Sequence, residues 1–274
     1  MLYDHIGPFK TLELTGTLFF LPQMSQPFDL CPGYHESAKA KATTSEGQKK
    51  RKVAEPSTDA VSVQHLRPGM ILLKRFVKPE DQIEVVCTCR RLGVGPGGFY
   101  RPSYKNGAKL NLWMMCLGKN WDLNTRSYGP TRPFDGAQAP AIPEAFKTIA
   151  QAANSTVSEF PQIILDICIV NCYTNSGKLG LHQDKDESKS SLSQGLPFIS
   201  ISIGDTAEFL FGDTGDKDKA TKVNLESGDV LILGGSSRLL FHGISHVKPN
   251  TSPRWLKEET GLRPGCINLT FRQY

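Results

Sequence analysis

Short apolar runs separated by turn residues fill the chain beyond residue 160, and they constrain its fold more than any other feature. Clusters of Gly, Asp, Ser and Pro stand between these runs. Several short strands with turn signals between them are typical of a β-sandwich or a β-barrel. We therefore predict strands at residues 163–173, 198–203, 207–211, 229–233, 238–242 and 266–272.

The residues before this region predict two flanking helices. Pro79 suits the first position of a helix, and the acids at Glu80 and Asp81 favour the positive end of its dipole. We expect this helix to run to about Arg91, and Pro143 to open a second one. The fold class expected is therefore α+β with a mainly β core.

Composition divides the chain into two parts. Residues 34–62 are rich in Ser, Ala, Lys, Thr and Glu, which predicts a disordered linker. We expect an N-terminal extension over residues 1–62 and one folded domain over residues 63–274. The basic cluster Lys49–Val53 resembles a nuclear import signal, with a solvated charge run as the alternative. It predicts a nuclear protein, with the cytoplasm as a second compartment.

Charge and cysteine content limit the partners. The net charge of +5 is compatible with a polyanionic partner but does not require one. Seven scattered cysteines make a poor disulfide framework and indicate a reducing compartment. The chain has no run of 18 apolar residues, so we expect no membrane-spanning segment.

A metal site is indicated by His182 and Asp184. Residues two apart on an extended segment point to the same face, so both side chains could bind one ion. A second imidazole could come from His242 or His246, and His242 ends the predicted strand 238–242 directly before Gly243. Two histidines and one carboxylate form the facial triad of non-haem iron(II) oxygenases. The alternatives are a surface loop residue for His182 and a polar strand-edge residue for His246.

The last predicted strand suggests an anion site. Alternation places Cys266, Asn268, Thr270 and Arg272 on one face and the apolar residues on the other. An Arg that faces into a small barrel requires an anionic partner. A bound dicarboxylate could supply it, and a structural salt bridge to an Asp or Glu is the alternative.

Several motifs, in order, resemble the AlkB family of Fe(II)/2-oxoglutarate-dependent dioxygenases. The resemblance covers roughly residues 65–274. The motifs are Pro96-Gly97-Gly98-Phe99, Leu117-Gly118 with Trp121, Asn171-Cys172-Tyr173, Gly177-Lys178-Leu179, Leu181-His182-Gln183-Asp184-Lys185-Asp186-Glu187, Ser200-Ile201-Ser202-Ile203-Gly204, Gly228-Asp229-Val230, Gly234-Gly235-Ser236-Ser237-Arg238, His242-Gly243-Ile244 and Asn268-Leu269-Thr270-Phe271-Arg272-Gln273.

The resemblance implies a double-stranded β-helix, or jelly roll, with a nucleotide-recognition lid at about residues 94–135. It implies iron(II), 2-oxoglutarate and O2 as cofactor and cosubstrates, with His182, Asp184 and His242 as the catalytic iron ligands. The residues implied to hold 2-oxoglutarate are Asn171, Tyr173, Asn268, Thr270 and Arg272. Those implied to contact the substrate base are Asp186, Trp121 and Tyr128.

The activity implied is oxidative demethylation of N-methylated bases in single-stranded DNA or RNA, of the 1-methyladenine, 3-methylcytosine or N6-methyladenine type. Formaldehyde, succinate and CO2 would be released, and we expect a monomer. The chain departs from the family at Cys266, where an Arg usually binds the far carboxylate of 2-oxoglutarate. Two alternatives therefore stand: a catalytically weak or inactive module that binds methylated nucleic acid, and a hydroxylase of a protein or small molecule.

Overall fold

The computed structural model describes residues 28–32, 61–174 and 176–274. The predicted linker and its basic cluster at Lys49–Val53 lie outside these residues, apart from the linker's last two positions. Among the helices of the described ranges, none is long and apolar enough to cross a bilayer.

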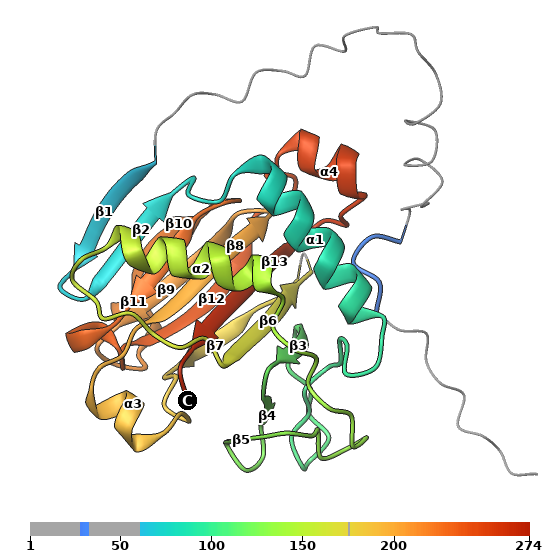
Figure 1. The fold of residues 1–274 in the computed structure, drawn as a ribbon, viewed down its shortest axis with the longest axis horizontal. Helices are drawn as coiled ribbons and strands as arrows, with labels where there is room; N and C mark the ends of the chain where they lie inside the picture. The colour runs from blue at the N-terminus through green and yellow to red at the C-terminus, as the bar shows by residue number, and fades with distance from the viewer. Residues whose placement is uncertain (1–27, 33–60, 175) are drawn as a thin grey trace, which may run out of the picture.

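Two antiparallel sheets form the body of the protein (Figure 1). In spatial order, the larger sheet contains β1 (Ser62–Arg67), β2 (Met70–Lys74), β11 (Val230–Leu233), β8 (Phe198–Gly204), β13 (Cys266–Arg272), β6 (Ile167–Tyr173) and β3 (Trp113–Leu117). The smaller sheet contains β10 (Thr221–Leu225), β9 (Ala207–Gly212), β12 (Phe241–Val247) and β7 (Leu179–His182). A separate hairpin pairs β4 (Asn120–Asp122) with β5 (Ser127–Gly129). The predicted β-sandwich of the jelly-roll type is confirmed.

Apolar side chains of the larger sheet divide between two layers. On β13, Ile267, Leu269 and Phe271 join the core beneath the helices, whereas Cys266 joins the core between the two sheets. The alternation predicted for this strand is therefore confirmed. Since the polar residues of β13 share the face of Cys266, they point between the sheets, where a site can form.

Within the described residues, four α-helices flank the sandwich. α1 (Pro79–Gly93) and α2 (Glu144–Thr156) cover the outer face of the larger sheet, and α4 (Arg254–Thr260) packs against α1 (Figure 1). The short α3 (Lys189–Ser193) follows the β7 loop. Both predicted helices are present: α1 begins at Pro79 as expected, and Pro143 is the N-cap of α2.

One predicted strand was wrongly placed. Residues 238–242 were expected to form a strand that ends at His242, but β12 begins at Phe241 and continues to Val247. The preceding residues turn instead, because the Arg238 side chain is fixed by the carbonyls of Leu196 (2.9 Å) and Asp184 (2.7 Å). His242 therefore lies at the start of a strand. Similarly, the strand predicted from residue 163 begins only at Ile167, opposite Arg272, the last residue of β13.

Residues 28–32 pack into the folded body, although they lie within the expected extension. Phe28 stacks on Trp113 with ring centroids 4.4 Å apart. Asp29 accepts two hydrogen bonds from Arg90, at 2.8 and 3.0 Å. The buried Leu30 accepts a backbone hydrogen bond from Arg263. This short segment therefore connects α1, β3 and the loop before β13.

Candidate active site

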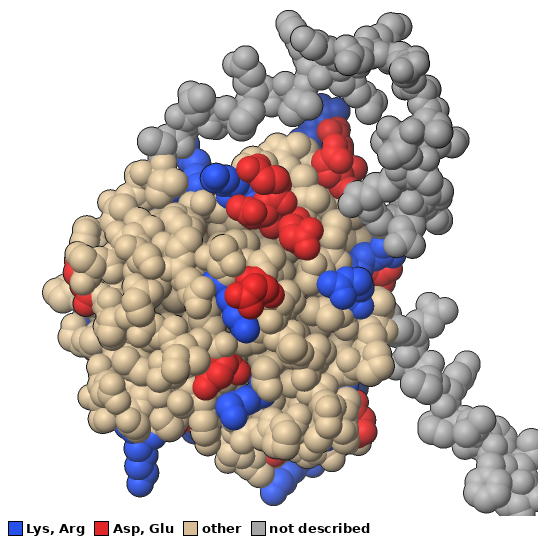
Figure 2. Space-filling model, in the orientation of Figure 1, with Lys and Arg blue, Asp and Glu red and all other residues tan. Residues whose placement is uncertain are grey.

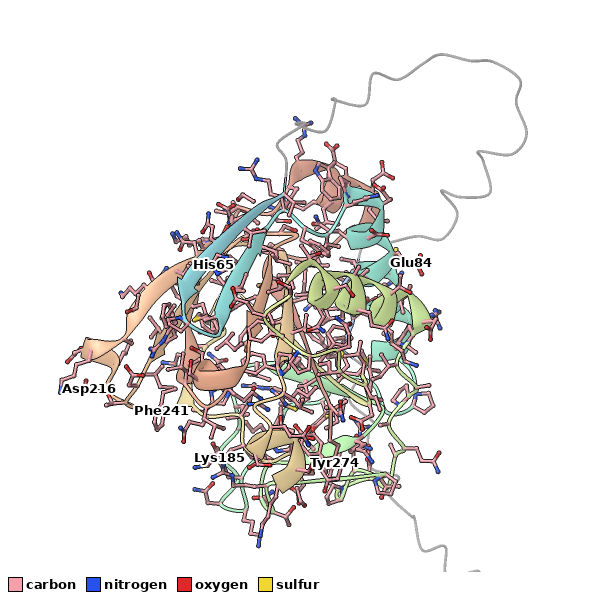
Figure 3. The ribbon with its side chains drawn as sticks, turned by 60° about the vertical axis from the view of Figure 1, so that its left-hand side comes forward. His65, Glu84, Lys185, Asp216, Phe241 and Tyr274 are labelled. Carbon is pink, nitrogen blue, oxygen red and sulfur yellow. The ribbon has the colours of Figure 1, made fainter. Side chains whose placement is uncertain are left out.

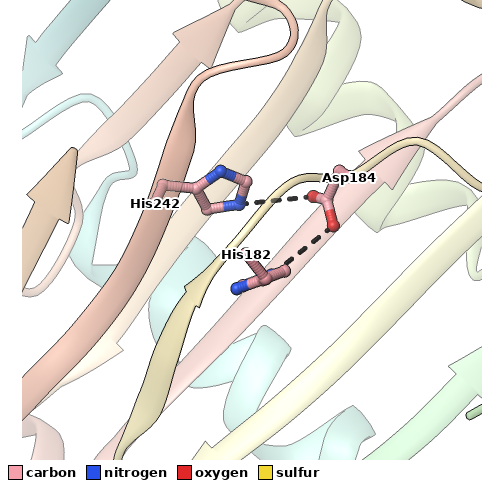
Figure 4. Close-up of side chains that lie close together, drawn as sticks. All are labelled: His182, Asp184 and His242. Carbon is pink, nitrogen blue, oxygen red and sulfur yellow. Dashed lines mark ion pairs between the residues drawn. The ribbon is translucent and has the colours of Figure 1, made fainter. Parts of the chain in front are cut away.

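The predicted metal ligands converge at one end of the smaller sheet. His182 ends β7 and lies directly opposite His242 on the neighbouring β12, and Asp184 follows two residues after His182. The distances are 3.6 Å from His182 Nε2 to Asp184 Oδ1 and 3.5 Å from His242 Nε2 to Asp184 Oδ2 (Figure 4). One candidate ligand atom from each residue lies within 4.8 Å of the others.

Backbone carbonyls orient both imidazole rings. His182 Nδ1 lies 2.9 Å from the carbonyl oxygen of Gly180, and His242 Nδ1 lies 3.0 Å from that of Leu240. Since a carbonyl can only accept, each Nδ1 carries a hydrogen, and in the neutral ring each Nε2 therefore keeps a lone pair. Both lone pairs are on the side of Asp184, which is the arrangement a metal ion requires.

The ionisation of the three groups follows from their surroundings. Burial would raise the pKa of Asp184, but the charge of Arg272 and the adjacent His182 and His242 rings hold that pKa well below its usual value. Burial, together with the charge of His182, lowers the pKa of His242. Burial opposes protonation of His182 too, but the Asp184 carboxylate outweighs it and raises the pKa of this ring. Asp184 is thus ionised and His242 neutral near pH 7, as an iron(II) site requires.

Arg272 connects the metal ligands to the rest of the cavity wall. Its guanidinium hydrogen-bonds the Asp184 carboxylate and donates to the Tyr128 hydroxyl at 2.7 Å. Its Nε lies 3.2 Å from a carboxylate oxygen of Glu187, which also pairs with Arg238 at 3.0 Å. Arg272 therefore makes the structural ion pairs that the sequence left as an alternative, and it does so at the wall of the predicted anion site.

Two adjoining cavities are lined by the residues that the resemblance assigns to iron, 2-oxoglutarate and the substrate base. A larger one of about 410 Å³ is lined by Trp121, Tyr128, Asn171, His182, Asp184, Asp186 and Arg272, among others. A narrow recess of about 40 Å³ behind it is lined by Asn171, Tyr173, His182, Asp184, His242, Asn268, Thr270 and Arg272, among others. His246 lines neither and lies 3.6 Å from Glu208, in keeping with a polar strand residue.

The predicted substrate residues hold the β4–β5 hairpin against the site through hydrogen bonds. Trp121 and Tyr128 face each other across β4 and β5. Trp121 Nε1 donates to Asp186 at 2.9 Å, and Arg126 donates to the other Asp186 oxygen at 3.2 Å. The Tyr128 hydroxyl accepts from Arg272. Both aromatic side chains thus line the same cavity as His182 and Asp184.

The recess fits one end of 2-oxoglutarate better than the other. The side-chain oxygen of Asn171 is buried without a hydrogen-bond partner among the described residues, so the wall has an unused polar atom for a ligand. Arg272 and Asn268 supply a cation and an amide. Cys266, which the family resemblance pairs with the far carboxylate, does not line the recess, and it is neutral because burial raises the pKa of its thiol to about 12. The residues therefore fit the iron and one carboxylate and lack a cation at Cys266.

Sequence reasoning assigned no role to the Glu187–Arg238 ion pair. Glu187 stands in the metal-binding signature and Arg238 in a separate motif, 51 positions later. Only the folded chain shows that both side chains are buried and joined, and that Arg238 also binds the backbone of Asp184. The pair positions the loop that carries the metal-binding carboxylate.

A two-histidine, one-carboxylate centre inside a double-stranded β-helix defines the class of non-haem iron(II) oxygenases. The chain matches the model of the 2OG-Fe(II) oxygenase superfamily over residues 69–272. It is 38% identical to the alpha-ketoglutarate-dependent dioxygenase AlkB of Escherichia coli, over 76% of this chain and 91% of that protein. The chain belongs to the AlkB family of iron(II)- and 2-oxoglutarate-dependent dioxygenases.

Plant relatives are more similar still. The DNA N(6)-methyladenine demethylase ALKBH1C of Arabidopsis thaliana is 54% identical over 76% of this chain and 49% of that protein. The structure of OsALKBH1 is 59% identical, with a TM-score of 0.75, and the match covers 78% of this chain and all of that one. The chain spans about half the length of the three A. thaliana relatives it matches.

Proposed function

We propose that this enzyme removes the methyl group from N6-methyladenine in DNA, and that it takes the base from a single strand. The names of the A. thaliana relatives support the base and the nucleic acid. The observation that carries the proposal is the position of Asp186, whose carboxylate is held at the wall of the cavity above the metal ligands.

Asp186 suits the exocyclic amine of this base. N6-methyladenine keeps one N–H on its exocyclic nitrogen, and a carboxylate oxygen accepts from it. That hydrogen bond fixes the rotation of the methylamino group and hence the direction of the methyl carbon. Trp121 and Arg126 hold the carboxylate from two sides, so it is already oriented when the base arrives.

The lid supplies the remaining contacts with the base. A target base has to leave its stack before it can enter a cavity of this kind, which costs least in a single strand. Trp121 and Tyr128 line the cavity, where their rings can replace the stacking that the base loses. Lys185 and Tyr274 lie at the lid end of the sandwich (Figure 3), and Lys185 and Arg126 line the cavity, where they can meet phosphates. On the face that α1 and α2 cover, acidic and basic side chains are interspersed (Figure 2).

When bound at His182, Asp184 and His242, iron(II) supplies the oxidation of the methyl group, with 2-oxoglutarate and O2 consumed and formaldehyde, succinate and CO2 released. The chain's own residues bind and orient. Arg272 supports the Asp184 carboxylate and attracts a carboxylate of the cosubstrate. The buried walls of the recess keep water from the reacting groups.

Mass spectrometry of a single-stranded DNA oligonucleotide with one N6-methyladenine tests this function. The full chain is incubated with iron(II), 2-oxoglutarate and ascorbate beside the variant His182→Ala. We expect the mass of one methylene to be lost with the wild type only. Parallel oligonucleotides carry 1-methyladenine or 3-methylcytosine. Loss from these alone would replace the proposed base, and no loss from any of them at high 2-oxoglutarate would overturn demethylation.

A further inference from the structure

A second cavity adjoins the one that holds the metal ligands. It has a volume of about 530 Å³, which is larger than the substrate cavity and within the usual range for ligand sites. Trp121 and Leu123 line both cavities, so the two share a wall. Nothing in the proposed reaction uses this second cavity.

Six aromatic side chains contribute to its lining. Phe28 and Trp113 lie parallel at 4.4 Å, and Tyr100 lies beside Phe134 with centroids 5.1 Å apart. Phe134 is 64% exposed, so much of its ring is open to a ligand. Exposed aromatic faces in a hollow are what nucleobases stack on, whatever their sequence.

Arg132 makes this platform rigid. Its guanidinium lies 4.8 Å from the Tyr100 centroid and 5.0 Å from that of Phe134. Asp135 accepts from it at 3.1 and 2.7 Å, and the Gly98 carbonyl at 2.7 Å. These three hydrogen bonds fix the guanidinium within the protein, so it can hold the two rings in place while the exposed part of Phe134 stays open to a ligand.

The charges of the lining favour an anionic backbone. Arg101 and Lys109 are exposed at this cavity, and the Arg101 guanidinium reaches the Leu110 carbonyl at 3.1 Å. The acid in the lining, Asp122, accepts hydrogen bonds from the Asn124 backbone and the Thr125 hydroxyl. Two exposed cations beside aromatic faces are the combination that binds single-stranded nucleic acid.

We propose that the second cavity holds the base of a nucleotide next to the methylated one in the same strand. This neighbouring base stacks on Phe134, while Lys109 and Arg101 meet its phosphate, and the shared Trp121 wall separates it from the methylated base. The inference rests on the proposed function for the identity of the ligand. It predicts that the enzyme recognises two nucleotides, the second through its aromatic face rather than its hydrogen-bonding edge.

Fluorescence anisotropy with single-stranded DNA heptanucleotides tests the second cavity. Each carries a central N6-methyladenine, and the neighbouring base is intact, deleted on the 5′ side or deleted on the 3′ side. For the wild-type full chain, deletion on one side weakens binding by roughly 5- to 150-fold, the range for loss of one stacked base. In Phe134→Ala this penalty disappears, because the stacking surface is gone.

Ile164→Ala is the matched control, since Ile164 is also an exposed apolar side chain and lies outside this cavity. It keeps the wild-type penalty. Lys109→Ala lowers the slope of log affinity against log salt by about 0.7, the value for one lost phosphate contact on a single strand.

Two results would overturn the second site: no penalty on either side in the wild type, or equal weakening of intact and base-deleted strands by Phe134→Ala. The same samples are scored for loss of the methyl group. Methyl loss without a flanking-base penalty leaves the proposed function standing and removes the second site. A flanking-base penalty without methyl loss leaves the second site standing and removes the proposed function.

Discussion

The variant Cys266→Arg tests how this chain holds the far carboxylate of 2-oxoglutarate. Cys266 faces the core between the two sheets and lies opposite Tyr173 on β6. Its thiol is 1% exposed and, because burial raises its pKa to about 12, neutral. Arg263 does not replace the missing cation, because its guanidinium lies 4.6 Å from the Phe28 centroid, on the N-terminal segment. A carboxylate at Cys266 would therefore lack an ionic partner there.

The magnitude follows from the charge pair that Arg would restore. Pairing a buried carboxylate with Arg is worth about 2–5 kcal/mol relative to leaving it unpaired. The packing strain of a larger side chain, about 1–3 kcal/mol, is present with and without the ligand, so it lowers the free energy of unfolding and leaves the affinity unchanged. We expect a gain in binding free energy of about 2–5 kcal/mol, which is roughly a 30- to 4,000-fold lower Kd for 2-oxoglutarate.

Titration calorimetry of the Mn(II)-loaded full chain measures this Kd. Cys266→Met adds bulk without charge and should not tighten binding. A 2-oxo acid that lacks the second carboxylate, 2-oxobutyrate, should gain nothing from Cys266→Arg. The reasoning is refuted if a folded, metal-binding Cys266→Arg protein holds 2-oxoglutarate no more tightly, or if 2-oxobutyrate gains as much.

Three further outcomes are expected. Iron(II) affinity should fall about tenfold per pH unit below the raised pKa of His182, because a proton on this ring competes with the metal. The fall should therefore begin above pH 6.5, the ordinary pKa of the ring. A metal titration between pH 5.5 and 8 that shows no change in affinity would contradict this. In Asp186→Asn, one acceptor oxygen has to serve both Trp121 and the base. The kcat/KM on the methylated strand should therefore fall roughly 10- to 150-fold, while the Kd for 2-oxoglutarate stays unchanged. An unchanged kcat/KM would exclude the proposed contact. Phe28→Ala removes a buried ring from its stack on Trp113. Urea denaturation should show a free energy of unfolding lowered by about 3 kcal/mol. An unaltered urea midpoint of unfolding would mean that residues 28–32 do not stabilise the domain.

The sequence by itself determined the local features of this protein. Alternation on the last strand placed Arg272 inward, Pro79 marked the start of α1, and the spacing of His182 and Asp184 put two ligands on one face. These features depend on residues close together in the chain, whose period and geometry follow from backbone stereochemistry. The ordered motifs added the family and its β-helix.

Only the tertiary structure decided which distant groups meet. His242 joins the site because β12 pairs with β7 in the register that sets it opposite His182, and the expected strand end was wrong by several residues. The Glu187–Arg238 pair, the position of Arg263 on Phe28 and the second aromatic cavity also escaped the sequence. Each depends on long-range strand pairing and side-chain packing, which local hydrophobic periodicity does not encode, because the same pattern is compatible with many registers and neighbours.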